Sequence, residues 1–90
     1  MRITRDIVIH PGRFVRRRML EKDMTITELA KQAGISTSRV SSIINGKRCI
    51  TTDSAIRLAH VLGTTPEVWL TKQMRYDLFM KEKEAVDTIN

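Results

Sequence analysis

The side chains between Ser36 and Arg48 have the types and spacing of a surface that binds nucleic acid. Ser38, Ser42 and Asn45 fall on one side of a helix in which successive residues are ~100° apart. The apolar residues of the same segment converge on the other side: Val40, Ile43 and Ile44. Short neutral side chains are unusual on a solvated helix face, where glutamate and lysine are favoured. They suit a helix that approaches base edges in a DNA major groove ~12 Å wide, and the alternative is a merely polar surface.

Side chains able to contact DNA extend beyond this face. We expect base contacts from Thr37, Ser38, Ser42 and Arg39. We expect phosphate contacts from Thr25, Thr27, Ser36, Asn45, Lys47 and Arg48. A helix that begins near Ile26 would offer free backbone N–H groups to phosphate, and the cations after the next helix would reach the same backbone. Serine hydroxyls both donate and accept hydrogen bonds, so part of the specificity is expected from DNA shape, or from Arg39 and Asn45.

Catalytic and metal-binding patterns find little support in this sequence. His10 and His60 are distant in sequence from each other and from Cys49, and no spacing typical of metal ligands occurs. Cys49 follows two cations, but no base that could activate it is identifiable. We therefore expect no enzymatic activity, no metal and no cofactor.

The composition is that of a small globular protein with a positively charged N-terminal part. The 90 residues carry a net charge of +6, and a single cysteine, which excludes an intrachain disulfide, is typical of the cytoplasm. Residues 1–63 hold twelve lysines and arginines against five acids, whereas residues 64–90 hold four against five. This asymmetry suits a polyanion such as DNA, although it would also serve solubility. No apolar run approaches the ~20 residues of a membrane span, and the N-terminus lacks the pattern of a signal peptide.

Local signals predict one all-α domain, residues 1–90, with five helices. The helices are expected at 11 to about 22, at 26–33, at 37–45, from a cap at Thr51 or Thr52 to Gly63, and from Pro66 past Phe79. Thr25 and Glu28 have the spacing of a capping box, and Gly34 and Gly63 are typical helix ends. Residues 1–9 are expected to form a short extended arm or edge strand.

The second and third helices together predict a helix-turn-helix at residues 26–46. They meet through Gly34, Ile35 and Ser36, a turn of the right length. An ordinary helical hairpin is the alternative, and the small polar face of the third helix favours DNA binding. Arg16–Arg18 pose a separate question, because three consecutive residues span ~200° of a helix and cannot all face one partner. They form either a solvated face or a surface for an acidic partner.

The last helix, residues 66–85, is a candidate for homodimerisation. Its large apolar residues exceed what one short helix needs to bury: Trp69, Leu70, Met74, Leu78 and Phe79. A chain of this length is only marginally stable as a monomer, which also favours a second copy. The alternative is that Trp69 fills the core of a single chain.

Several motifs resemble the HigA (VapI-like) antitoxins, which are lambda-repressor-like, Xre-type helix-turn-helix proteins. The shorter ones are His10-Pro11-Gly12, Thr27-Glu28-Leu29-Ala30 and Asn45-Gly46-Lys47-Arg48. The most specific pattern lies in the C-terminal part, with Pro66-Glu67-Val68-Trp69-Leu70, Gln73 and Tyr76-Asp77-Leu78. The resemblance covers residues 10–79. Two departures are Arg16–Arg18, where the family often has acids, and a turn before Ile26 that is about one residue shorter.

The resemblance implies a homodimeric antitoxin of a type II toxin–antitoxin pair. Such proteins bind an inverted repeat in the promoter of their own operon, repress it, and neutralise a HigB-like toxin, an mRNA-cleaving ribonuclease of the RelE type. The same resemblance places Thr37, Ser38 and Ser42 at the base-reading positions. A stand-alone repressor without a toxin is the alternative, and a protein-interaction module that no longer binds DNA is a third hypothesis.

Overall fold

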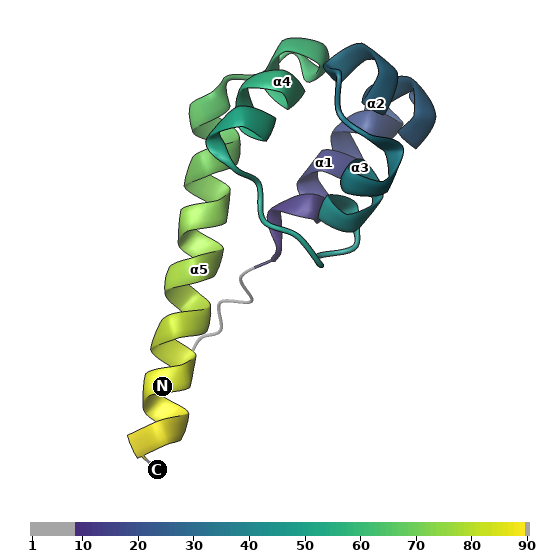
Figure 1. Ribbon diagram of the computed structural model, residues 1–90. Helices are drawn as coiled ribbons and strands as arrows, with labels where there is room; N and C mark the ends of the chain where they lie inside the picture. The colour runs from purple at the N-terminus through teal and green to yellow at the C-terminus, as the bar shows by residue number, and fades with distance from the viewer. Residues whose placement is uncertain (1–8, 90) are drawn as a thin grey trace.

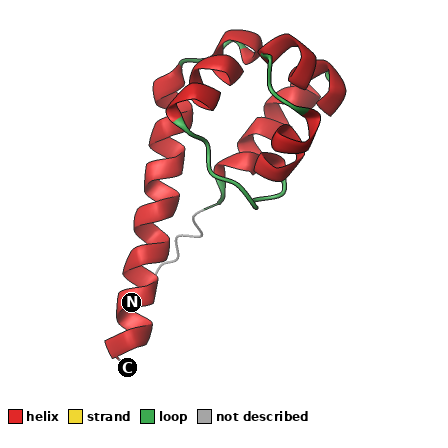
Figure 2. Ribbon diagram, viewed as in Figure 1, coloured by secondary structure: helices red, strands yellow, loops and turns green. Residues whose placement is uncertain are grey.

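The computed structural model describes residues 9–89, which fold into helices joined by short loops (Figures 1 and 2). In chain order the helices are α1 (Pro11–Glu21), α2 (Ile26–Ala33), α3 (Thr37–Ile44), α4 (Thr52–Leu62) and α5 (Pro66–Ile89). Helices α1 to α4 form the body, whereas α5 packs against α4 and α1 and then continues beyond the body (Figure 1). The expected five-helix, all-α fold is confirmed. The arm or strand expected at residues 1–9 lies, apart from Ile9, outside the described residues.

Side-chain caps explain where most of these helices begin. The predicted capping box is present, because the Thr25 backbone donates to Glu28 Oε1 at 2.8 Å and the Glu28 backbone donates to Thr25 Oγ1 at 3.1 Å. Thr51 forms a second box with Ser54, which decides between the two caps considered for α4. The helix ends differ from the predictions by one residue at α1 and α3, where Lys22 and Asn45 are C-caps rather than helical residues.

One core lies between the helices. It contains Val40, Ile43 and Ile44, the residues expected on the inner side of α3, together with aliphatic residues of α1 and α4: Val15, Met19, Ala55, Leu58, Ala59 and Leu62. Leu29, Ala30 and Ala33 of α2 join them, whereas Ile26 is only half-buried at the edge of the core. The amphipathic pattern of each short helix therefore identified its inward face.

Trp69 belongs to this core and is not available as an interface residue. Its side chain is 2% exposed, and its indole Nε1 donates to Thr64 Oγ1 at 2.7 Å. The dimer contact expected from Trp69 is thus corrected to a core contact within one chain. The reason is that α5 turns this side of its first two turns toward α4.

Gly12 allows α1 and α3 to approach closely. A Cβ at this position would overlap the Ile43 carbonyl oxygen and lie 3.0 Å from Ile44 Cα, both backbone atoms that cannot rotate away. The neighbouring His10 caps α1 through its imidazole, because Gly12 N–H donates to Nδ1 at 3.0 Å. The His-Pro-Gly motif is therefore the joint through which α1 begins against the end of α3.

Two arginine side chains form hydrogen bonds with the C-terminal ends of helices that are remote from them in sequence. Arg18 Nε donates to the Leu62 carbonyl at the end of α4, at 2.8 Å. Arg57 donates to the Ala33 carbonyl at the end of α2, at 3.3 Å, while its Nε pairs with Asp53 at 3.1 Å. Both donate to carbonyls that have no hydrogen-bond partner within their own helix, because they lie at its end. Their positive charges also interact favourably with the negative end of the helix dipole.

Candidate nucleic-acid interface

The outer face of α3 has the small polar character predicted for a DNA-reading helix. Thr37 and Ser38 are exposed and Ser42 is half-buried, while the opposite side of the helix faces the core. Ser36 is the N-cap, and its hydroxyl accepts from the Arg39 backbone at 3.1 Å. No long side chain of α3 covers the outer face, so its hydroxyls can approach another surface closely.

Arg39 lies apart from these residues. Its guanidinium turns toward the start of α4, where Nη2 donates to Thr51 Oγ1 at 3.2 Å. Its Nε is buried and has no partner among the described residues. In this conformation Arg39 joins two helices, and base contact by Arg39 would require its side chain to leave Thr51.

The start of α2 offers less to a phosphate than the sequence predicted. The capping box already uses two of the backbone N–H groups there, those of Thr25 and Glu28. Hydrogen bonds that the Glu28 carboxylate accepts from Thr25, first from its backbone N–H and then from its side chain, lower the pKa of Glu28 and so keep this exposed carboxylate charged beside the helix start. The exposed hydroxyl of Thr27 and the remaining N–H groups are left for an anion, with a negative charge close by.

The loop after α3 presents the clearest positive charges. Lys47 and Arg48 are both exposed, and neither has an ion-pair partner among the described side chains, residues 9–86. The loop backbone is held in place, because Lys47 N–H donates to the Ser42 carbonyl at 2.9 Å. Asn45 Nδ2 is 3.4 Å from Ser41 Oγ and remains exposed. These residues therefore stand at the edge of the α3 face with their cations free.

A hydrogen-bonded connection from this loop to α5 was missed from the sequence. The buried Gln73 accepts from the Ile50 backbone at 2.8 Å and donates to Asp77 at 2.9 Å. Tyr76 meets the His10 ring edge-on, with centroids 4.8 Å apart. Burial lowers the pKa of His10, and the nearby Asp77 carboxylate opposes this effect only in part. The sequence did contain a signal for this connection: Gln73 follows Trp69 by four residues and so lies on the same side of the helix.

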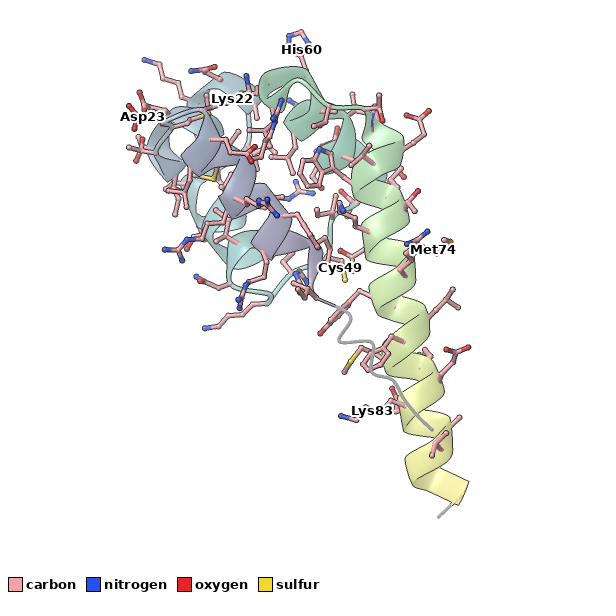
Figure 3. All side chains as sticks on the ribbon, turned by 180° about the vertical axis from the view of Figure 1, so that it is seen from behind. Lys22, Asp23, Cys49, His60, Met74 and Lys83 are labelled. Carbon is pink, nitrogen blue, oxygen red and sulfur yellow. The ribbon has the colours of Figure 1, made fainter. Side chains whose placement is uncertain are left out.

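The residues considered for catalysis do not come together. His60 is exposed on α4 and Cys49 is exposed in the loop before α4, and Figure 3 shows the two well apart. Among the side chains that the structure describes, those of residues 9–86, there is no group of three or more His, Cys, Asp or Glu residues able to hold a metal ion. In the same part of the chain, no helix is both long enough and apolar enough to cross a membrane.

The other residues predicted for a dimer interface lie on two sides of α5. Leu70, Met74 and Leu78 follow at intervals of four and so form one stripe, in which Met74 and Leu78 are each 52% exposed. Met74 points away from the body (Figure 3). Phe79 is half-buried and lies on the next side of the helix. Beyond Phe79, the described side chains up to Val86 are exposed, because the helix has left the body.

Comparisons with known proteins agree with this arrangement. The helix-turn-helix family (HTH_3) matches residues 15–69. Antitoxin HigA-1 of Vibrio cholerae is 38% identical over 80 residues, covering 88% of this chain and 75% of that protein. Two solved structures each cover 93% of this chain and 92% of their own. An addiction module antidote protein of the HigA family from Coxiella burnetii has a TM-score of 0.82 at 42% identity. Pseudomonas aeruginosa antitoxin HigA with the higBA promoter has a TM-score of 0.85 at 29% identity. The chain belongs to the helix-turn-helix family and, within it, to the HigA antitoxins.

Proposed function

We propose that this protein is an antitoxin that represses its own operon and neutralises a HigB-like ribonuclease. The observation that carries the DNA-binding part is the exposed hydroxyl face of α3, with the free cations Lys47 and Arg48 at its edge. Thr37, Ser38 and Ser42 would read bases in the major groove. Lys47, Arg48 and Asn45 would hold the phosphates on either side of them. The protein would act by binding in the cytoplasm, without catalysis of its own.

A single charge tests the orientation of α3. Ser38→Glu places a carboxylate on the face that would approach phosphates, and we expect it to abolish binding to the DNA upstream of the protein's own gene. His60→Glu makes the same change in charge at an exposed position at the far end of the body (Figure 3) and should leave binding unchanged. Fluorescence anisotropy measures binding, and circular dichroism verifies the fold. Full promoter binding by Ser38→Glu would show that α3 does not face DNA.

The protein would bind DNA as a homodimer through the stripe of Leu70, Met74 and Leu78. Two copies related by a twofold axis would present two α3 helices to half-sites ~34 Å apart, one turn of DNA. Leu78→Glu should yield monomers in analytical ultracentrifugation, because it places a charge within an apolar contact. Ile56→Glu alters a comparably exposed aliphatic residue on α4 and should leave the dimer intact. A dimer that survives Leu78→Glu would remove α5 as the interface.

Neutralisation of a toxin distinguishes this proposal from a stand-alone repressor. The product of a small reading frame next to this gene should co-purify with the protein, and the complex should lack mRNA cleavage. Expression of that product alone should stop growth, and co-expression should restore it. If the neighbouring product neither binds this protein nor stops growth, the protein is a repressor without a toxin partner. The α3 face would still account for its binding to the promoter.

A further inference from the structure

A groove lies beside the proposed DNA surface, outside the residues of the α3 face. It has a volume of about 910 Å³ and lies between the first half of α1, the end of α3 and the middle of α5. Its lining includes His10, Arg13, Arg16, Asn45, Gly46 and Tyr76. Two of these, Asn45 and Gly46, begin the loop that carries Lys47 and Arg48. The groove is therefore continuous with the edge of the α3 face.

The arginines of α1 have different surroundings in the structure. The sequence alone did not show which of them face solvent and which face another part of the protein. Arg18 is committed to the end of α4, through its 2.8 Å bond to the Leu62 carbonyl. Arg17 is 76% exposed, and its Nε is 3.7 Å from Glu21 Oε2. Arg16, together with Arg13 one turn earlier, lines the groove. Among the side chains of residues 9–86, neither the Arg13 nor the Arg16 guanidinium has an ion-pair partner, and neither guanidinium makes a hydrogen bond to the described residues.

We propose that Arg13 and Arg16 bind the phosphodiester backbone of the DNA whose bases face α3. This inference rests on the proposed function and adds a second phosphate-binding segment on α1. Two unpaired guanidinium groups in a groove with no acidic lining residue form a site for an anion. Guanidinium groups match phosphate oxygens with two parallel hydrogen bonds, so a backbone suits them well.

The groove is continuous with the edge of the α3 face, and this favours DNA over an acidic protein surface as its occupant. The groove shares Asn45 and Gly46 with the loop at the edge of the α3 face, so a backbone held by Lys47 and Arg48 would pass its mouth. An acidic protein segment in the groove would instead compete with DNA at that loop. The start of α2 is a weak phosphate site, because the capping box uses its N–H groups and the Glu28 carboxylate is negatively charged. Arg13 and Arg16 would supply phosphate contacts that α2 lacks.

The salt dependence of promoter binding tests the assignment. Each phosphate that a cation neutralises contributes about 0.9 to the log–log slope of affinity against salt. The double variant Arg13→Gln/Arg16→Gln should lower the slope by about 1.8 per protomer, about 3.6 for a dimer on two half-sites, and affinity at 0.15 M salt by about 1,000-fold. Arg13→Lys/Arg16→Lys keeps both charges and should keep the slope. Arg17→Gln removes one charge from the same helix outside the groove and should change neither quantity.

The outcomes separate failure of this inference from failure of the proposed function. If the unmodified protein shows no salt-dependent binding to its promoter, the proposed function fails, and this site with it. If that binding is present and the double glutamine variant keeps the full slope, α1 does not contact phosphates. An equal loss of slope in Arg17→Gln would reveal a general effect of net charge and would also overturn the assignment. So would a double variant that binds DNA normally but no longer binds the neighbouring gene product.

Discussion

Replacement of Gly12 by alanine tests how closely α1 and α3 must pack. At an ordinary helix position this substitution favours the folded state by up to about 1 kcal/mol, because alanine is the better helix former. Here the added Cβ would overlap the Ile43 carbonyl oxygen, and it would lie 2.9 Å from the carbonyl carbon. An ordinary contact is 3.4–4 Å, so the two helices must move apart by more than an ångström. We therefore expect the sign of the effect to reverse.

The size of the loss follows from the atoms involved. Insertion of one carbon into a well-packed core costs about 1–3 kcal/mol when side chains can adjust. The atoms facing Gly12 are backbone, so the cost should lie at the upper end, about 3 kcal/mol, against which the gain in helix propensity is small. For a domain of this size, 1 kcal/mol corresponds to about 4–8 °C in Tm. Gly12→Ala should thus lower Tm by more than about 10 °C.

Urea and thermal unfolding followed by circular dichroism measure this loss. All variants must be compared at one protein concentration, because the stability of an oligomer depends on it. Gly46→Ala is a suitable comparison. The atoms nearest to its Cβ would be those of the His10 side chain, at 3.6 Å and beyond, which is ordinary contact, so its cost is mainly that of alanine at φ +75°, about 1–2 kcal/mol. Gly12→Ala with unchanged or raised stability would refute the close approach of α1 to α3. A smaller loss than that of Gly46→Ala would do the same.

Three further predictions follow from individual residues. Neutral His10 caps α1 and burial lowers its pKa, so the stability it contributes is complete above pH 6.5 and is lost as pH falls through the lower folded value. Urea unfolding at pH 7.5 and 5 should show this loss, and His10→Asn, a cap that does not titrate, should lose less. Lys47→Ala should weaken binding to all DNA sequences alike and lower the salt slope by about 0.9 per protomer, about 1.8 for the dimer, whereas a loss confined to one operator sequence would contradict a phosphate contact. Trp69→Ala should cost about 3–5 kcal/mol and unfold the chain, so a folded monomer detected by ultracentrifugation and circular dichroism would argue against its core position.

The features predicted correctly from the sequence are those that depend on neighbouring residues. The capping box of Thr25 and Glu28 spans four residues, and the glycines after α2 and α4 act within one turn. The inward faces of the helices follow from spacing alone, which is why Val40 and Ile43 could be placed in the core. The direction of Ser38 followed from the same periodicity.

The features that could not be predicted depend on how distant helices meet. Arg18 and Arg57 reach carbonyls 44 and 24 residues away, and no local pattern marks a cap supplied by another helix. Trp69 was open to two interpretations, because its own helix does not reveal which side faces α4. Arg39 was expected near DNA for a similar reason. Nothing in the local sequence indicated that Thr51, twelve residues later, lies beside its guanidinium.

The contacts between the α3 loop and α5 determine how a dimer would present its two DNA-reading helices. In the proposed dimer α5 forms the interface, so the separation of the α3 helices depends on the angle between α5 and the body. Besides the packing of α5 on α4, that angle is held by the buried hydrogen bond from the Ile50 backbone to Gln73 and by the edge contact of His10 with Tyr76. Half-sites recur with the helical turn of DNA, ~34 Å, so a small rotation of α5 would misplace one α3 when the other is bound. In the proposed dimer, Gln73 and Tyr76 would therefore act on operator spacing without contact to DNA. The C-terminal motif and the helix-turn-helix would then form one functional unit.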